Sequence, residues 1–322
     1  MSKNKLNLED LLSSKYAEIL VTENENDGKI KSIKTGSLSL DISTGVGGIP
    51  LGRFTEIYGS EGCGKTTLAL SICDNAIKDG YKVLYIDPEM GVDFDFVRSV
   101  VKNFNKDNFM LVKPKTLEQS LQFAEAGIDS DEYQVIILDS IGSMAPQKVF
   151  DDELTDQNVA LLSRLMTIWV QRNAYSVRNK GVAFIGINQV RDKVGSYFGT
   201  YETPGGHAWK HILSLKIQLS KISDIEQDGN KIGINTKFVI KKNKLSSPYR
   251  SYMFPIIFGK GVDTVRDIVD FATMLGVIDR SGAYYKYNGD TLGQGMNKTI
   301  EYLQSSQETL DKIVEECYNA TK

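Results

Sequence analysis

The amino-acid sequence predicts an α/β fold: a phosphate-loop core on a mostly parallel sheet, an N-terminal helical appendage and a small α+β C-terminal domain. Two observations predict this class. Between residue 31 and about residue 260, apolar runs rich in β-branched residues alternate with helical stretches, an order typical of a parallel sheet with helices on both faces. A glycine-rich loop at 59–66 stands between an apolar run and an amphipathic stretch, the usual context of a phosphate loop.

Composition excludes several classes of protein. Of the 322 residues, 41% are hydrophobic and 25% are charged, as in an ordinary soluble globular protein. A net charge of -3 argues against coating nucleic acid through bulk charge, but it leaves a local nucleic-acid groove open. No apolar run approaches the ~18 residues of a membrane span, and the N-terminal residues lack the apolar core of a signal peptide. Three cysteines without metal spacing favour the reducing cytoplasm, so we expect a cytoplasmic protein without a membrane partner.

We expect three regions along the chain. Residues 1–30 form an N-terminal oligomerisation helix and linker, because five apolar residues make a stripe that must pack on the chain's own core or on a neighbouring subunit. Residues 31–261 form the core. Residues 262–322 form the small domain, with helices at 264–275 and 298–318 and a hairpin turn at Asn288-Gly289 after an aromatic run.

The core elements follow from the pattern in order. Strands are expected at 54–58, 82–87, 110–112, 135–139, 182–188, 213–219, 237–241 and 253–258. Helices are expected at 67–78, 93–103, 117–128 and 159–178. The last strands follow one another closely and so predict antiparallel pairs, and Pro255 indicates an edge position for the last one.

The phosphate loop carries the most specific signal. It consists of Gly59, Ser60, Glu61, Gly62, Cys63, Gly64, Lys65 and Thr66, and Thr67 opens the helix that follows. Its glycines allow backbone N–H groups to point at phosphate oxygens. Lys65 is expected to reach the β- and γ-phosphates of ATP, and the Thr66 hydroxyl is expected to ligate Mg²⁺. Cys63 is either a thiolate favoured by the helix N-terminus or a small packing residue.

Three further strand ends carry polar groups that should meet this loop, since the carboxyl ends of parallel strands share one edge. Asp139 ends one strand and is expected to hold Mg²⁺, directly or through water. Glu89 follows another and is the candidate base for the attacking water, with Asp87 the less favoured choice. A third strand ends in Asn188 and Gln189, whose uncharged amides can sense a γ-phosphate.

The segment 190–206 is glycine-rich and irregular. It mixes Arg191 and Lys193 with Tyr197, Phe198 and Tyr201, which suits phosphate contacts and base stacking. The alternative is a lid with buried aromatic residues. His207 and His211 stand four residues apart and could face one side of a helix, but a zinc site would need further ligands, so packing or phosphate contact is the favoured interpretation.

Several segments together resemble the bacterial RecA recombinases. They are Thr35-Gly-Ser-Leu-Ser-Leu-Asp41, Gly47-Gly-Ile-Pro-Leu-Gly-Arg53, the phosphate loop, Ile86-Asp-Pro-Glu89, Asn188-Gln-Val-Arg191, Lys242-Asn-Lys244 with Pro248, and Gly293-Gln-Gly295. The similarity runs from about residue 7 to residue 304. It implies a RecA-type ATPase core whose copies form a helical filament on single-stranded DNA, pair it with a homologous duplex and exchange strands. Single-strand-binding and mediator proteins would be further partners.

The resemblance also implies residue roles. Glu89 would activate water, Gln189 would sense the γ-phosphate, and Lys242 and Lys244 would reach the ATP of a neighbouring subunit. Asp93 and Phe96 fall where the family contacts adenine. The first DNA-facing loop corresponds to 148–159 and the second to 190–206, which gives as DNA-binding candidates Val159, Arg164, Arg191, Lys193, Val194, Phe198, Gly205, Gly206 and His207.

The chain departs from the family pattern in places. The first loop is acidic, Asp192 and Tyr197 replace residues that are usually apolar, and His211 replaces an aromatic residue. Such divergence suits a bacteriophage-encoded member. Two other functions remain as alternatives: a ring-forming helicase or loader on the same core, and a nucleoprotein scaffold that promotes repressor self-cleavage.

Overall fold

The computed structural model describes residues 30–151, 160–192 and 201–321. The chain divides into two units, Met1–Ile30 and Lys31–Lys322. The sheet, its helices and the candidate sites belong to the second unit. The helix expected within residues 1–30 lies outside the described residues.

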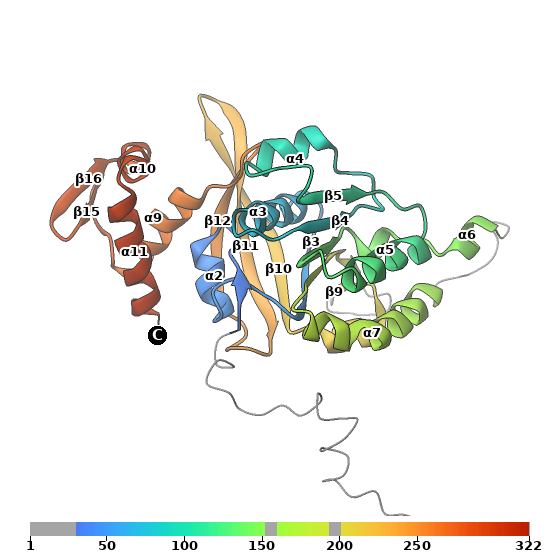
Figure 1. The fold of residues 1–322 in the computed structure, drawn as a ribbon. Coiled ribbons are helices and arrows are strands. Elements are labelled where there is room, and N and C mark those ends of the chain that lie inside the picture. Colours follow the sequence, from blue (N-terminus) through green and yellow to red (C-terminus); the bar gives the residue numbers. More distant parts are fainter. Residues whose placement is uncertain (1–29, 152–159, 193–200, 322) are drawn as a thin grey trace, which may run out of the picture. The chain divides into compact units, whose positions relative to one another are not determined.

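The core of the second unit is a mixed sheet with the strand order β13-β12-β11-β10-β3-β7-β6-β4-β5 (Figure 1). Neighbouring strands from β10 to β5 run parallel, and those from β10 to β13 run antiparallel. The strands are β3 (Arg53–Gly59), β4 (Val83–Ile86), β5 (Phe109–Val112), β6 (Val135–Leu138), β7 (Ala183–Gln189), β10 (Leu215–Gln227), β11 (Asn230–Asn243), β12 (Ser251–Ile257) and β13 (Gly261–Val262). The predicted mostly parallel sheet with antiparallel late strands is confirmed.

Helices cover both faces of the sheet, because alternate strand residues point to opposite sides. Val135 and Ile137 of β6 pack in a core with α3 (Lys65–Lys78) and α4 (Phe94–Val100). Ile136 and Leu138 pack in a second core with α5 (Leu117–Asp129), α7 (Leu161–Asn179) and α8 (Gly206–Ile212). Around these lie η2 (Ile141–Ser143), α6 (Gln147–Asp151), β8 (Arg191–Asp192) and β9 (Tyr201–Glu202).

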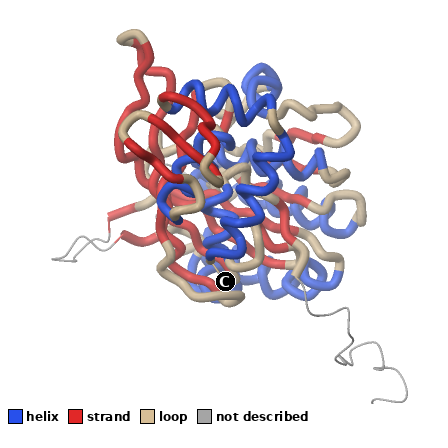
Figure 2. The backbone as a smooth tube through the Cα atoms, turned by 90° about the vertical axis from the view of Figure 1, so that its left-hand side faces the viewer, coloured by secondary structure: helices blue, strands red, loops and turns tan. Residues whose placement is uncertain are grey.

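Strands β10 and β11 are much longer than the sequence pattern predicts. Their hairpin extends past the rest of the sheet (Figure 2). In this part of β10, Ser223 and Asp224 are polar, whereas Ile225 is buried and Ile222 is exposed. The apolar residues do not alternate regularly in this part, so the sequence pattern gives no strand signal there. Strand β12 lies next to the edge rather than at it, because the two residues of β13 pair with its end.

The C-terminal segment forms a third core. It contains α9 (Thr264–Leu275) and the small antiparallel sheet of β14 (Asp279–Ser281), β15 (Tyr284–Tyr287) and β16 (Asp290–Gln294). The predicted hairpin turn is found, with φ of 50° at Asn288 and 89° at Gly289. The prediction of a single helix at 298–318 is wrong. Ser306 leaves helical geometry and separates α10 (Met296–Ser305) from α11 (Gln307–Ala320), and its hydroxyl shares a hydrogen bond with that of Thr309.

A short buried helix that the sequence analysis did not predict joins this segment to the sheet. Helix α2 (Leu38–Thr44) lies between the strands β1 (Ser32–Ile33) and β2 (Ile49–Pro50) in the chain and packs on α9 and β12. The buried Asp267 of α9 accepts hydrogen bonds from the hydroxyls of Ser37 and Ser39 at 3.1 and 2.8 Å. Among the described helices, none combines the length and the apolar character needed to cross a membrane.

Candidate nucleotide-binding and catalytic site

The phosphate loop joins the end of β3 to the start of α3. Gly62 and Gly64 have φ of 69° and 92°, which residues with a β-carbon rarely adopt. A β-carbon on Gly64 would also lie 2.3 Å from Cδ1 of Ile256. Lys65 Nζ donates to the carbonyl oxygens of Gly59 and Ser60 at 3.1 and 2.7 Å, so the ammonium group lies against the loop itself. The backbone amides, the helix N-terminus and this cation together suit a phosphate chain.

Asp139 lies directly beside the start of α3. Its Oδ2 accepts hydrogen bonds from the Thr66 hydroxyl at 2.9 Å and from the Tyr85 hydroxyl at 2.7 Å. Burial raises the pKa of Asp139 to about 6, although both hydrogen bonds oppose that shift. A hydroxyl and a carboxylate side by side are oxygen donors of the kind that Mg²⁺ prefers. The sequence analysis did not identify Tyr85 as a residue of this site. The signal that could have identified it is a tyrosine within an otherwise aliphatic strand.

Glu89 contacts the end of β7 and the residue that follows Asp139. Its Oε1 accepts hydrogen bonds from the Ser140 hydroxyl and, at 3.3 Å, from Nε2 of Gln189. Asp87 is instead buried, where it accepts from the amides of Gly91 and Val92 and lies 3.9 Å from Lys113 Nζ. The carboxylate available for chemistry is therefore that of Glu89.

These side chains line one cavity of about 340 Å³. Its walls come from the phosphate loop and from the ends of three strands, and they consist of Glu61, Gly62, Gly64, Lys65, Thr66, Thr67, Glu89, Asp139, Ser140 and Gln189. Phosphate-binding amides, a lysine, oxygen donors for a cation and a free carboxylate thus converge. These residues fit ATP with Mg²⁺, and the arrangement suits hydrolysis of the terminal phosphate.

Cys63 takes no part in the lining of this cavity. The residue is fully buried, and burial raises the pKa of its thiol. A β-carbon on Gly59 would come within 2.7 Å of Cys63 Sγ, so the sulfur fills the space behind the loop. The structure favours the packing interpretation of Cys63 over the reactive thiolate.

Asp93 and Phe96 lie at the start of α4 and do not line the cavity. The Asp93 carboxylate accepts a hydrogen bond from the Phe96 amide at 2.7 Å and so caps the helix. The Phe96 ring is half-buried against the core beside α3. Capping explains Asp93 structurally, and adenine contact by this pair stays a prediction.

A buried carboxylate that sequence reasoning missed ties β3 to the far end of the second predicted loop. Glu56 is completely buried. Its oxygens accept from Asn188 Nδ2 at 2.9 Å, Trp209 Nε1 at 2.9 Å and the Thr203 hydroxyl at 3.3 Å, and Lys216 Nζ lies 2.8 Å away. An acidic residue inside an apolar strand was the available signal, since such a charge must be paired.

The predicted DNA-binding residues fall into two groups. Val159, Lys193, Val194 and Phe198 lie outside the described residues. Arg191 belongs to β8, which pairs with β9 at the base of the second loop. Arg164 on α7 and His207 on α8 are exposed, and a β-carbon on Gly206 would meet Ser163 at 3.0 Å. Arg164, Gly205, Gly206 and His207 are therefore brought together where α7 and α8 pack.

Lys242 and Lys244 are at the opposite end of α8. Both ammonium groups donate to the carbonyl oxygen of His211, at 3.2 and 2.8 Å, and Lys242 also donates to that of Lys210. Burial and the neighbouring Lys244 and Lys216 lower the pKa of Lys242. Neither lysine lines the cavity that holds Lys65.

The histidine pair does not build a metal site in the described part of the chain. The rings of His207 and His211 have centroids 6.4 Å apart. No group of three or more potential ligands from His, Cys, Asp or Glu occurs among residues 30–151, 160–192 and 201–321. The zinc alternative therefore finds no support there.

Comparisons with known proteins concern the family and the fold of the chain. The model of the RecA N-terminal domain matches residues 11–263, and that of the RecA C-terminal domain matches residues 266–322. Protein RecA of Aquifex pyrophilus is 38% identical over 286 residues, which cover 88% of this chain and 82% of the relative. Protein RecA of Clostridioides difficile strain 630 is 36% identical over 287 residues, covering 89% and 82%. The solved RadB recombinase is similar with a TM-score of 0.55 and 20% identity, over 71% of this chain and 98% of that one, and this likeness concerns the fold.

Proposed function

The chain belongs to the RecA family and has its fold, and on that premise we propose that it is an ATP-dependent DNA recombinase. It would polymerise on single-stranded DNA, pair that strand with a homologous duplex and exchange strands. Its ATPase activity would depend on DNA and on contacts between subunits. The proposed place of action is the cytoplasm, where DNA and ATP are both present.

The observation that carries the proposal is the contact between Gln189 and Glu89 in the phosphate-loop cavity. Gln189 ends β7, and the chain continues from it into the second predicted DNA loop. A γ-phosphate in the cavity would compete for the Gln189 amide. Such competition would link the state of the nucleotide to the conformation of the segment that follows.

The catalytic roles follow from position. Thr66 and Asp139 would hold Mg²⁺, and this ion would neutralise phosphate charge when it is bound. Lys65 would move from the loop carbonyls to the phosphates. Glu89 would orient the attacking water and accept its proton, while Ser140 and Gln189 fix the direction of the carboxylate.

Lys242 and Lys244 would act on the ATP of a neighbouring copy. Both lie outside the phosphate-loop cavity of their own copy, and among the described residues their ammonium groups donate only to carbonyl oxygens at the end of α8. Two cations brought to the γ-phosphate by assembly would stabilise the charge of the transition state. We prefer the recombinase to the ring-forming helicase because the similarity extends through residues 266–322 of the C-terminal segment.

The experiment that tests this proposal measures ATP hydrolysis with and without single-stranded DNA, with negative-stain images of the same samples. We expect DNA-stimulated turnover and helical filaments, both lost in Lys65→Ala. Closed rings with directional unwinding would replace the proposal with the helicase alternative. Tight ATP binding without DNA stimulation or assembly would refute it.

A further inference from the structure

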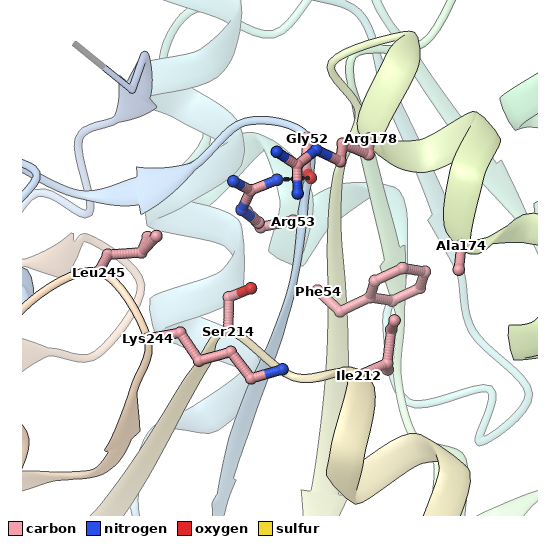
Figure 3. A pocket seen from close by; sticks show the side chains of 9 residues that line it. All are labelled: Gly52, Arg53, Phe54, Ala174, Arg178, Ile212, Ser214, Lys244 and Leu245. Atoms are coloured by element: carbon pink, nitrogen blue, oxygen red, sulfur yellow. Dashed lines mark hydrogen bonds between the residues drawn. The ribbon is translucent and has the colours of Figure 1, made fainter. Parts of the chain in front are cut away.

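A second pocket, lined by basic residues, lies at the opposite end of the sheet from the phosphate loop. It has a volume of about 230 Å³ and is lined by residues that include Arg53, Arg178, Ser214 and Lys244 (Figure 3). Arg53 begins β3 and Gly59 ends it, so the two sites are roughly 20 Å apart at the usual rise of a strand. The pocket therefore cannot serve the nucleotide bound by the same copy.

The pocket gathers positive charge without a compensating carboxylate. No acidic residue is among the described residues that line it. Within the described part of the chain, the side chains of Arg53, Arg178 and Lys244 form no ion pair with a carboxylate. Lys180, two residues beyond Arg178, behaves differently, because it lies 2.9 Å from an oxygen of Asp131 and 4.0 Å from one of Asp129. The missing counter-charge is thus a property of the pocket rather than of this end of α7.

Arg53 is the member with the least access to water. Its Nη1 donates to the carbonyl oxygen of Gly52 at 3.2 Å, a neutral acceptor. Burial and the nearby Arg178 both lower the pKa of Arg53, which means that its surroundings disfavour the charged guanidinium group. In Figure 3 the two guanidinium groups lie at one end of the pocket and the Lys244 ammonium at the other, with Ser214 between them. Phe54 and Ile212 supply an apolar wall.

We propose that this pocket binds a phosphate group, held by Arg53 and Arg178 with help from Lys244. Guanidinium groups form paired hydrogen bonds with phosphate oxygens, and a lysine adds a point charge. A doubly charged phosphate offsets the three cations better than a single carboxylate does. Two sources supply this chemistry: a phosphate compound free in solution, and the nucleotide of a second copy. The second source rests on the proposed function, since Lys244 would there face a neighbouring ATP.

The first arm of the test counts bound pyrophosphate by equilibrium dialysis on the full-length protein. Wild-type protein should bind two, the second site remaining in Lys65→Ala, whose phosphate loop is disabled. Arg178→Gln should weaken that remaining site at least about tenfold, as expected for the loss of a charge-assisted hydrogen bond. Arg172→Gln is the matched control, because Arg172 is an exposed arginine on the same helix outside the pocket.

The second arm measures self-assembly by sedimentation, with and without a non-hydrolysable ATP analogue. If a second copy supplies the phosphate, Arg178→Gln weakens assembly only with the nucleotide, and Arg172→Gln does not. Equal loss in both conditions means an ordinary protein contact and excludes the nucleotide of a second copy as the source, and it overturns the proposal if Arg178→Gln also leaves pyrophosphate binding unchanged. The absence of any Arg178 effect in both arms overturns the proposal as well. A faulty phosphate-loop assignment would appear separately, as pyrophosphate binding that Lys65→Ala leaves unchanged.

Discussion

Asn188 and Gln189 are neighbours in β7, yet their amides serve different parts of the molecule. Asn188 Nδ2 donates to Glu56 and to the carbonyl oxygen of Pro204 at 2.8 Å, near the end of the second predicted loop. Gln189 Nε2 donates to Glu89 in the nucleotide cavity. Because successive side chains of a strand point to opposite sides, one dipeptide reaches both places.

The role of Glu89 leads to the first prediction. Glu89→Gln keeps the oxygen that accepts from Ser140 and Gln189, but it removes the ability to take a proton. We expect ATP hydrolysis to fall at least about 100-fold while ATP binding stays within a few-fold of wild type, as for loss of a general base. Single-turnover hydrolysis and nucleotide titration measure the two effects. Glu226→Gln, an exposed position, is the control, and a Glu89→Gln enzyme with near-normal turnover would remove Glu89 from the mechanism.

Residue roles were predictable to different degrees. The phosphate loop, Asp139, Glu89 and Gln189 could be predicted to meet because parallel strands end at one edge of the sheet. The environment of Cys63 could not be predicted. Its burial depends on the close approach of Gly59 and on the contact of Thr236 with the loop, and the fold sets both.

At the scale of elements, β3 connects the two sites. It begins at Arg53 in the basic pocket, contains the buried Glu56 and ends at the phosphate loop. Its pairing with β7 on one side and β10 on the other brings Asn188 and Lys216 to Glu56. The position of the second loop's end therefore depends on the same strand that carries the phosphate loop.

The second prediction concerns this network. Glu56→Gln leaves the Lys216 ammonium without its carboxylate, and we expect the free energy of unfolding to fall by roughly 3 kcal/mol, as for a broken buried ion pair. Urea denaturation measures the loss. In the double variant Glu56→Gln with Lys216→Met the uncompensated charge is gone, so part of the stability should return. A single variant as stable as wild type would contradict the account of Glu56.

The contact of α2 with α9 gives a third prediction, on pH. Burial raises the pKa of Asp267 to about 7, from 3.8 in the unfolded chain, against hydrogen bonds that favour its charged form. Between these values the folded state holds a proton that the unfolded state has released. The free energy of unfolding should therefore fall as pH rises from about 4 to about 7, by at most about 1.4 kcal/mol per pH unit for one group.

Asp267→Asn should flatten this slope. Asp41 of α2 has its pKa raised in the same direction, to about 7, so some slope remains in the variant. Urea denaturation at about pH 5 and about pH 7 provides the measurement, with the exposed Glu301→Gln as control. Equal slopes in Asp267→Asn and wild type would exclude Asp267 as the titrating group.

Elements were predictable where burial imposes a period. Strands β3 to β7 and helix α9 follow from their apolar spacing. Helix α2 could not be predicted in this way. All of its residues are buried, polar ones included, so its sequence has no alternation between a polar exposed side and an apolar buried side. The break at Ser306 was also missed, since apolar residues continue with helical spacing on both sides of it.

At the scale of the whole molecule, charge is divided between the two ends of the sheet. The cavity at one end contains Glu89 and Asp139, and the surface near the other end carries Lys242, Lys244 and the arginine pair. Copies stacked end to end would bring these opposite charges together. Such complementarity would allow one chain to supply both halves of the proposed shared site.

We propose that each ATP is hydrolysed between two copies, and mixing two inactive variants tests this arrangement. Glu89→Gln retains the lysines, and a Lys242→Ala, Lys244→Ala double variant retains Glu89. Each alone on single-stranded DNA should hydrolyse ATP poorly. Mixed in equal amounts, they form some interfaces that combine an intact Glu89 with intact lysines, so DNA-stimulated turnover should rise well above either variant. Turnover equal to the mean of the two separate samples, although filaments form, would contradict a site shared between copies.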